Sequence, residues 1–421
     1  MTSAETPAAT VERRSSFGPF AYGDFTIYQV ARILLILAGQ FVILALQWQV
    51  YHLTNSKLHL GMIGLVQFLP NLLLSLPAGH VADHMNRRSI VMTCALANAA
   101  TVGLLAWQAA LPSPSLTVIY AACGLFGLIR AFSAPAGHAF LPALVPASLL
   151  QNAIVWHLVT FQLSTVLGPA AAGFLYGQDR PARVYSIGAG LFVLAFLGLA
   201  LIRARPRPAP AKEPFSRAVS AGIRYVWEDK RLLGAMTLDL FAVLLGGATA
   251  LIPSIAKDIL GRGPEVLGIL RSSPALGAGI MALALAFHPL RRRIGAWMLA
   301  GVAVYGLATI GFGLSTNLPL TLAFLVVSGA ADMLSVTVRH TLIQVATPDA
   351  MRGRVSAVSM VFINTSNELG EFESGLTAHW WGTARAIVVG GIGTVAVVLA
   401  WTGVFPALRR ADEFAQKPAA P

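Results

Sequence analysis

Apolar runs long enough to cross a bilayer recur along the whole chain, and they constrain its fold more than any other feature. A helix of ~20 apolar residues crosses the ~30 Å hydrocarbon core of a membrane. Runs of about this length span residues 26–54, 59–81, 89–110, 115–137, 152–176 and 182–202, then 232–254, 266–289, 295–314, 318–338, 355–380 and 384–405. We therefore predict an all-α membrane protein with 12 transmembrane helices.

A polar stretch divides the twelve runs into two sets of six. The predicted segments are a cytoplasmic N-terminal tail (1–22), a six-helix half (23–202), a cytoplasmic linker (203–231), a second six-helix half (232–406) and a cytoplasmic tail (407–421). Within the linker, prolines occupy every second position from Pro206 to Pro210, which predicts a stiff, extended connector. We expect Phe215–Glu228 to form an amphipathic helix on the membrane surface.

The two halves resemble each other in sequence. The segment 64–70 matches 268–274, and the same spacing of 204 residues places Arg87 and Arg88 on Arg291 and Arg292. Further along, Val145-Pro146 lies 202 residues before Thr347-Pro348. Two halves in the same order predict parallel repeats related by a pseudo-two-fold axis along the membrane normal. Such repeats place the substrate path between the halves and permit alternating access by rocking.

The distribution of Lys and Arg predicts the orientation of the chain. If the N-terminus is cytoplasmic, the inner segments hold most of the basic residues, namely Arg13, Arg14, Arg87, Arg88, Arg203, Arg205, Arg207, Lys212, Arg217, Arg291, Arg292, Arg293, Arg352, Arg354, Arg409 and Arg410. The positive-inside rule then places both termini in the cytoplasm. Trp380 and Trp381 would mark the outer interface.

The composition argues against several other classes of protein. Only 11% of the residues are charged, whereas a soluble domain carries ~25%. The net charge of +12 comes from residues spread over short loops, so we expect no nucleic-acid partner. Cys94 and Cys123 lie inside apolar runs, which indicates neither a disulfide framework nor a metal site. No His-Glu-x-x-His, Gly-x-Ser-x-Gly or phosphate-binding loop is present, so we expect no enzyme and no cofactor.

A short charged segment, Gly79–Arg88, interrupts two long apolar runs and predicts a tight cytoplasmic turn. Its pattern of Gly79, Asp83, Arg87 and Arg88 resembles the signature loop between helices 2 and 3 of the major facilitator superfamily.

Three further blocks narrow the resemblance. They are Pro135–Pro146 with Asn152-Ala153, Leu238–Ala248 running on to Asp258, and Thr347–Ser356. Together they resemble the branch that contains the enterobactin exporter and the transmembrane secretion effectors. The resemblance implies a monomeric, multi-pass exporter in the bacterial inner membrane. The cargo would be a small molecule such as a siderophore, drug or hydrophobic metabolite, and the driving force the proton gradient.

The fifth run carries Gly168, Pro169 and Gly173, which resembles the span-5 motif of antiporters in this superfamily. Small residues at helical spacing let helix backbones approach closely, and Pro169 removes a backbone donor. Ordinary tight packing is the alternative explanation of the same residues.

Ionisable groups inside the runs are candidates for proton coupling, because a charge in hydrocarbon normally faces a cavity or a partner. We expect Asp239, Asp332 or Glu368 to exchange a proton, with Arg32 and Arg130 as the local cations. The 202-residue spacing places Arg130 and Asp332 at equivalent depth, so a pair between the halves is feasible. The alternative is a static ion pair that stabilises one conformation.

Polar residues on two helix faces are candidates for the substrate pathway. Arg32, Gln40 and Gln47 fall within an ~80° arc of the first run. The eleventh run places Asn364, Asn367, Glu368 and Glu371 on one face. Phe132 and Phe241 are further candidates, although phenylalanines at such helix positions more often pack against lipid or core.

The two repeats differ at the signature loop. The position equivalent to Asp83 is Phe287, so only the first loop has an acid to pair with Arg352 or Arg354. We therefore expect an asymmetric cytoplasmic gate in which Asp83 latches the halves. An importer on the same fold, and a membrane sensor that transports nothing, stay open as alternatives to an exporter.

Overall fold

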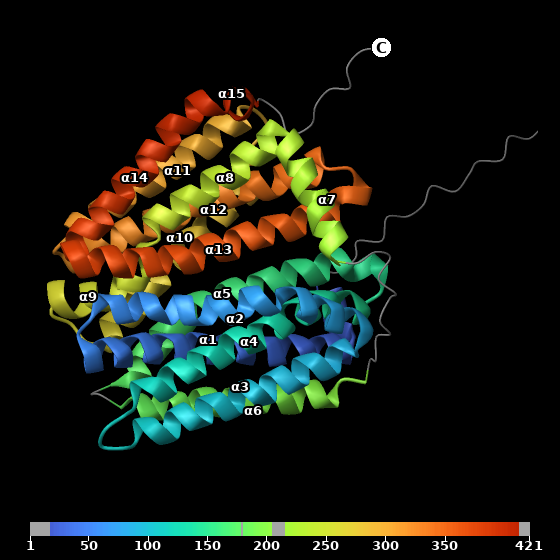
Figure 1. Cartoon of the computed structure of the whole chain (residues 1–421). Helices are drawn as coiled ribbons and strands as arrows, with labels where there is room; N and C mark the ends of the chain where they lie inside the picture. Colours follow the sequence, from blue (N-terminus) through green and yellow to red (C-terminus); the bar gives the residue numbers. More distant parts are fainter. Residues whose placement is uncertain (1–16, 178–179, 204–214, 412–421) are drawn as a thin grey trace, which may run out of the picture.

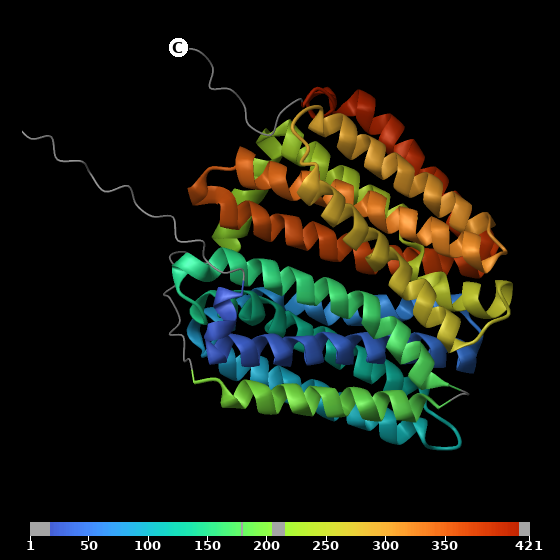
Figure 2. The same cartoon turned by 180° about the vertical axis from the view of Figure 1, so that it is seen from behind.

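The computed structural model describes residues 17–177, 180–203 and 215–411, and within these ranges the chain is helical with no strand. The first half contains α1 (Gly23–Thr54), α2 (Lys57–His84), α3 (Arg87–Ala109), α4 (Leu116–Phe140), α5 (Leu150–Tyr176) and α6 (Pro181–Leu201). The second contains α7 (Phe215–Glu228), α8 (Lys230–Gly246), α9 (Ile252–Ser254), α10 (Pro264–Phe287), α11 (Ile294–Leu314), α12 (Leu318–Ala346), α13 (Asp349–Trp381), α14 (Thr383–Val404) and α15 (Pro406–Arg409). Figures 1 and 2 show the two halves as stacked layers of long helices.

The fold class predicted from the sequence is confirmed: the molecule has two bundles of six long helices. Within the described residues, eleven helical segments are long and apolar enough to cross a membrane. The twelfth is α13, which is 33 residues long but has a row of polar residues along it. Because α13 packs against α2, α8 and α14, most of these polar groups are buried or half-buried. The predicted domain boundaries stay a prediction.

The predicted turn at residues 79–88 and the predicted seventh run both differ from the structure. Residues 79–84 continue α2, so the turn before α3 is only Met85 and Asn86, and the Asn86 side chain accepts a hydrogen bond from the Arg88 N–H at 3.0 Å. The seventh run is broken after Gly246 into α8, a 3-10 turn (Ala248–Leu251), α9 and a π-helical turn (Ile255–Ile259).

The expected amphipathic helix is present as α7, with the predicted bounds. It packs against α13, where a Cβ at Gly222 would lie 2.7 Å from the Arg354 carbonyl oxygen. The Tyr225 hydroxyl donates to the Ala346 carbonyl at 3.0 Å, while Ile223 and Trp227 are exposed. The predicted Pro206–Pro210 connector lies outside the described residues.

Two helix pairs join the halves, and they are equivalent by the internal repeat. α2 packs along α13, and α10 packs along α5. In one pair, a Cβ at Gly173 would lie 2.5 Å from the Pro264 carbonyl oxygen, and a Cβ at Gly268 would lie 2.5 Å from the Pro169 carbonyl oxygen. In the other pair, a Cβ at Gly375 would lie 2.7 Å from the Gly61 Cα. Only glycine permits backbones this close.

These glycine contacts lie near the end of the bundle where α1 passes to α2, here named the 55–56 end; the 85–86 end is the opposite one. At the 55–56 end, Lys57 pairs with Asp258 at 3.4 Å, and Tyr51 hydrogen-bonds to the same carboxylate. The Lys257 ammonium donates to the Asn55 side chain at 3.2 Å.

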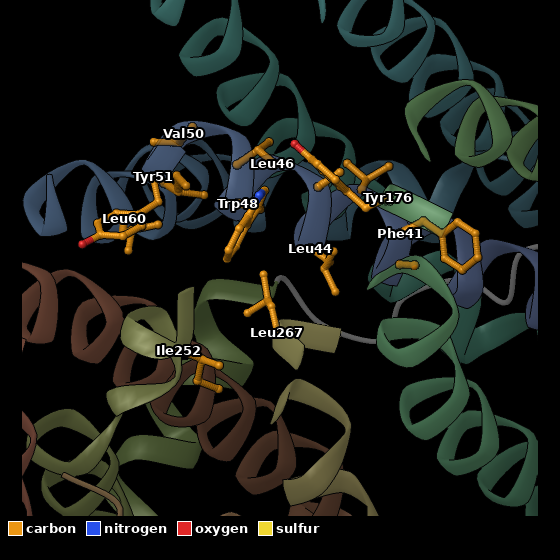
Figure 3. Close-up of a cluster of buried hydrophobic side chains, with 14 of the residues drawn as sticks. Phe41, Leu44, Leu46, Trp48, Val50, Tyr51, Leu60, Tyr176, Ile252 and Leu267 are labelled. Atoms are coloured by element: carbon orange, nitrogen blue, oxygen red, sulfur yellow. The ribbon is translucent and has the colours of Figure 1, made fainter. Parts of the chain in front are cut away.

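A shared apolar core supports these polar contacts. Figure 3 shows Leu44 and Trp48 of α1 facing Ile252 and Leu267 of the second half, and all four side chains are buried. Because both halves contribute to one core at the 55–56 end, this end of the molecule is closed.

Alanine at these glycines tests the closure. We expect Gly268→Ala and Gly375→Ala to separate the halves at the 55–56 end, because each new Cβ meets backbone atoms. Double electron–electron resonance between spin labels at Leu53 and Arg262, in a chain without Cys94 and Cys123, would report a longer distance. Gly190→Ala is the matched control, since nothing lies within 4 Å of its Cβ. That change should leave the distance unchanged and gain up to ~1 kcal/mol of helix stability. An unchanged distance in all three variants would contradict the closure.

Candidate functional site

A polar cavity of about 530 Å³ lies between the two halves. Its wall includes side chains from α1, α2 and α4 of the first half and from α10, α12 and α13 of the second. The charged and amide side chains in the wall are Gln40, Gln67, Arg130, Arg271, Asp332, Asn367, Glu368 and Glu371, and the hydroxyl-bearing ones are Thr249, Tyr305, Thr309 and Ser328. A cavity of this size fits a drug-sized ligand, and its position matches the substrate path that the repeat predicted.

An ion pair crosses the cavity from one half to the other. The Arg130 guanidinium of α4 donates to the Glu368 carboxylate of α13 at 2.6 Å. The Glu368 side chain is 12% exposed, whereas that of Arg130 is 49% exposed and faces open space. Arg130 therefore pairs with Glu368 and not, as the sequence suggested, with Asp332.

A second polar contact joins α10 to α1. The Arg271 guanidinium donates to the Gln47 side chain, which is fully buried. Glu371 lies close enough to interact electrostatically with Arg271, Arg130 and Glu368. The cavity lining thus contains two cations, Arg130 and Arg271, and three acids, Asp332, Glu368 and Glu371.

Asp239 belongs to a different cluster inside the second half. It forms an ion pair with Arg339 of α12, and both side chains are less than 10% exposed. Asp332 interacts electrostatically with Asp239, Arg339 and Tyr305, and it also lines the cavity. This geometry corresponds to the static ion pair that was the alternative for Asp239.

Arg32 is not a cation for these carboxylates. Its guanidinium donates to the His157 carbonyl at 2.7 Å and to the Thr160 hydroxyl at 3.4 Å, and it lies 5.9 Å from the Phe161 ring centroid. Arg32 therefore ties α1 to α5 within the first half, and the expectation that it would face an acid was wrong.

The remaining pathway candidates separate into two groups. Gln40 and Asn367 line the cavity with Glu371, while Asn364 lies one turn earlier on α13 and outside the lining. Phe132 packs against the buried core of the first half. Phe241 is 39% exposed and contacts Trp401, with ring centroids 5.5 Å apart. The two phenylalanines thus follow the packing alternative.

The residues of the antiporter-like motif make close contacts with neighbouring helices. A Cβ at Gly168 would lie 2.7 Å from the Gln40 Cβ, and Pro169 and Gly173 form the contact with α10 described above. Gly168 therefore lets α1 present Gln40 to the cavity.

The predicted cytoplasmic gate lies at the 85–86 end. Arg88 donates to the Leu199 and Ala200 carbonyls at 3.0 and 2.5 Å, so it caps the last turn of α6. Gly79 and Asp83 lie in the last two turns of α2, and Arg87 begins α3. The Asp83 side chain lies outside the described part of the structure.

The sequence analysis does not include Arg339 because the predicted tenth run ends at residue 338, whereas α12 continues to Ala346. An arginine seven residues after Asp332, on the same helix face, was the available signal. Gln67 was missed as a lining residue, although the repeat aligns it with Arg271, which also lines the cavity. Among the described residues, no group of three or more His, Cys, Asp or Glu is placed to hold a metal ion.

Comparisons with known proteins agree with this architecture. A family model described as transmembrane secretion effector matches residues 14–421. The enterobactin exporter EntS of Citrobacter koseri is 26% identical over 401 residues, which cover 93% of each chain. The exporter of the same name from Shigella boydii serotype 18 is 27% identical and covers 78% of this chain and 79% of its own length.

Solved transporter structures share the fold. A bacterial homologue of the human lysosomal transporter Spinster superposes with a TM-score of 0.75 at 13% identity and covers 95% of this chain and 99% of its own. A POT family transporter gives a TM-score of 0.74 at 11% identity and covers 91% and 96%.

Removing one partner of the buried Asp239–Arg339 pair should destabilise the protein strongly. We expect Asp239→Asn to lower the free energy of unfolding by ~3–5 kcal/mol, because it leaves the Arg339 charge uncompensated. The double variant Asp239→Asn/Arg339→Met should recover much of the loss. Thermal unfolding in detergent would measure both.

The control is Asp229→Asn at the start of the same helix. Burial alone would raise the pKa of the Asp229 carboxyl, but the hydrogen bonds and charge of Arg231 outweigh it and hold the pKa below its usual value. This partly exposed pair should cost no more than ~1 kcal/mol. Equal destabilisation by the two single variants would contradict the buried ion pair.

Proposed function

The chain belongs to the transmembrane secretion effector family of the major facilitator superfamily, and from that premise we propose that it is a proton-coupled exporter of a small molecule. It is a multi-pass membrane transporter by family and fold. The observation that carries the proposal is the ion pair between Arg130 and Glu368, which crosses the cavity between the halves.

The orientation follows from the basic residues at the 85–86 end, which include Arg87, Arg88 and Arg291–Arg293. The positive-inside rule assigns this end, and both termini, to the cytoplasm. The closed 55–56 end then faces outward, with Trp380 and Trp381 exposed near it. Cargo would enter the cavity from the cytoplasm and leave after the halves rock apart at the 55–56 end, as export requires.

Glu368 is the residue we propose for proton coupling. Its carboxylate holds Arg130 across the cavity, and a proton on that carboxylate removes the charge that attracts the guanidinium. Proton uptake and the contact between the halves are therefore linked. Asp239 is less suited to this role because Arg339 already compensates its charge in the interior of one half. Asp332, which lines the cavity, is the second candidate.

The relatives named as enterobactin exporters support a siderophore as the first cargo to test. We expect inverted membrane vesicles to accumulate enterobactin when a proton gradient is imposed. Glu368→Gln should lower the gradient-driven rate by at least about tenfold, which corresponds to ~1.4 kcal/mol. The gradient should no longer accelerate the residual transport.

Glu373→Gln is the matched control, because it removes a carboxylate from the same helix at a position outside the cavity lining. It should transport at the unsubstituted rate. Uptake into right-side-out vesicles, with none into inverted ones, would favour an importer. Gradient-dependent transport by Glu368→Gln would remove Glu368 from proton coupling.

Asp83 is the proposed cytoplasmic latch. It lies in the last turn of α2, two residues before the turn to α3, and its repeat counterpart Phe287 ends α10. Asp83→Asn should lower transport by about tenfold while membrane insertion and expression stay unchanged. Phe287→Leu serves as the control and should transport normally. Normal transport by Asp83→Asn would rule out the latch.

A further inference from the structure

A second cavity of about 530 Å³ lies entirely within the first half and is mostly apolar. We name it the ring chamber, because Phe126 of α4, Phe161 of α5 and Phe192 of α6 form part of its wall. Its other apolar wall residues come mainly from α1 and α3. The predicted pathway did not include it.

The ring chamber adjoins the polar cavity. Ile43, Gln67 and Arg130 line both cavities, so Arg130 stands at the junction between an apolar space and a polar one. A ligand that fills the chamber with an apolar body can therefore reach Arg130 with a polar group.

The Arg130 guanidinium has hydrogen-bond donors at this junction beyond the one that binds Glu368. A guanidinium has five N–H donors, and within the described part of the chain Arg130 uses one of them, to Glu368. Its side chain is 49% exposed although it lies deep between the helices. The side-chain amides of Asn98 and Gln67 also line the chamber and add polar groups to its wall.

Among the Asp, Glu, Lys and Arg side chains of the described residues, the chamber wall carries positive charge only. Arg130 is the sole ionisable Asp, Glu, Lys or Arg among the residues that line it, and the acids of the polar cavity lie on the second half. By the repeat, the second half has Asp332 at the position equivalent to Arg130. A positive group beside an apolar wall selects an anion with an apolar body.

We propose that the ring chamber and Arg130 form a binding site for an aromatic organic acid. Its ring system occupies the chamber, and its carboxylate or phenolate binds the Arg130 guanidinium in competition with Glu368. The proposal rests on the transport function inferred above and specifies the class of cargo.

Direct binding tests the site with three benzophenones that differ in charge. The probes are 4-benzoylbenzoate, the neutral 4-(hydroxymethyl)benzophenone and the cationic 4-(aminomethyl)benzophenone. Binding to the full chain in lipid nanodiscs would be measured by calorimetry. We expect the acid to bind at least about tenfold more tightly than the other two, since a hydrogen bond to a charged group contributes that much.

Substitutions separate the charge from the chamber. Arg130→Met should abolish the preference for the acid, whereas Glu368→Gln should strengthen its binding several-fold because the guanidinium is released. Phe126→Ala should weaken all three probes. Phe132→Ala, on the same helix but packed in the core, is the control for general loss of stability and should leave the affinities unchanged.

Photo-crosslinking identifies where the acid binds in the chain. Irradiated 4-benzoylbenzoate should attach to peptides of α1, α3 or α4, and Arg130→Met should remove that label. Equal affinity for the three probes, or a label confined to α10–α13, would overturn the site. Binding of the acid without transport would refute the proposed function and leave the site standing. Proton-driven transport of cargo that is indifferent to Phe126→Ala would refute the site and leave the proposed function standing, because Phe126 lines the chamber and takes no part in the Arg130–Glu368 pair.

Discussion

The free-energy cost of leaving a polar group unpaired in hydrocarbon determines which helices and which side-chain pairs this molecule forms. Helices satisfy their own backbone hydrogen bonds, which is why long helices are the solution for each apolar run. The same cost acts on charged side chains, so Asp239 and Arg339 pair with each other, Arg130 pairs with Glu368, and Arg32 binds a carbonyl of α5. The polar face of α13 is tolerated because that helix lies against α2 and α8.

Two kinds of contact hold the halves together, and they have different consequences for movement. At the 55–56 end the contacts are glycine backbones, a shared apolar core and the interactions of Asp258. At mid-depth they are polar and face a cavity, as between Arg130 and Glu368. The proposed proton coupling acts on the polar contacts, whereas the glycine contacts can open only by rigid-body movement of the halves. A transporter that rocks between two states needs both.

The repeat gives the two halves the same helix order, and residues at equivalent positions differ in charge at the cavity. Gly173 and Gly375 are equivalent and serve equivalent contacts. Gln67 and Arg271 are also equivalent and line one cavity, although one is neutral and the other charged. Arg130 corresponds to Asp332, which reverses the sign of the charge. The polar cavity is therefore asymmetric, and the ring chamber adjoins its positive side.

Hydropathy determined the number and order of the long helices, because length and polarity largely decide what crosses a bilayer. Their limits came from the structure, which extends α12 to Ala346 and breaks the seventh run after Gly246. The sequence also placed Glu368 and Glu371 on one face of a helix, because helical periodicity is local. Which charge pairs with which was decided only by tertiary structure. Arg130 pairs with Glu368, Arg32 donates to a carbonyl of α5, and Asp239 pairs with Arg339. Each pairing depends on the rotation and approach of helices that are far apart in the chain. No local pattern encodes those rotations, since they result from all the helix contacts together.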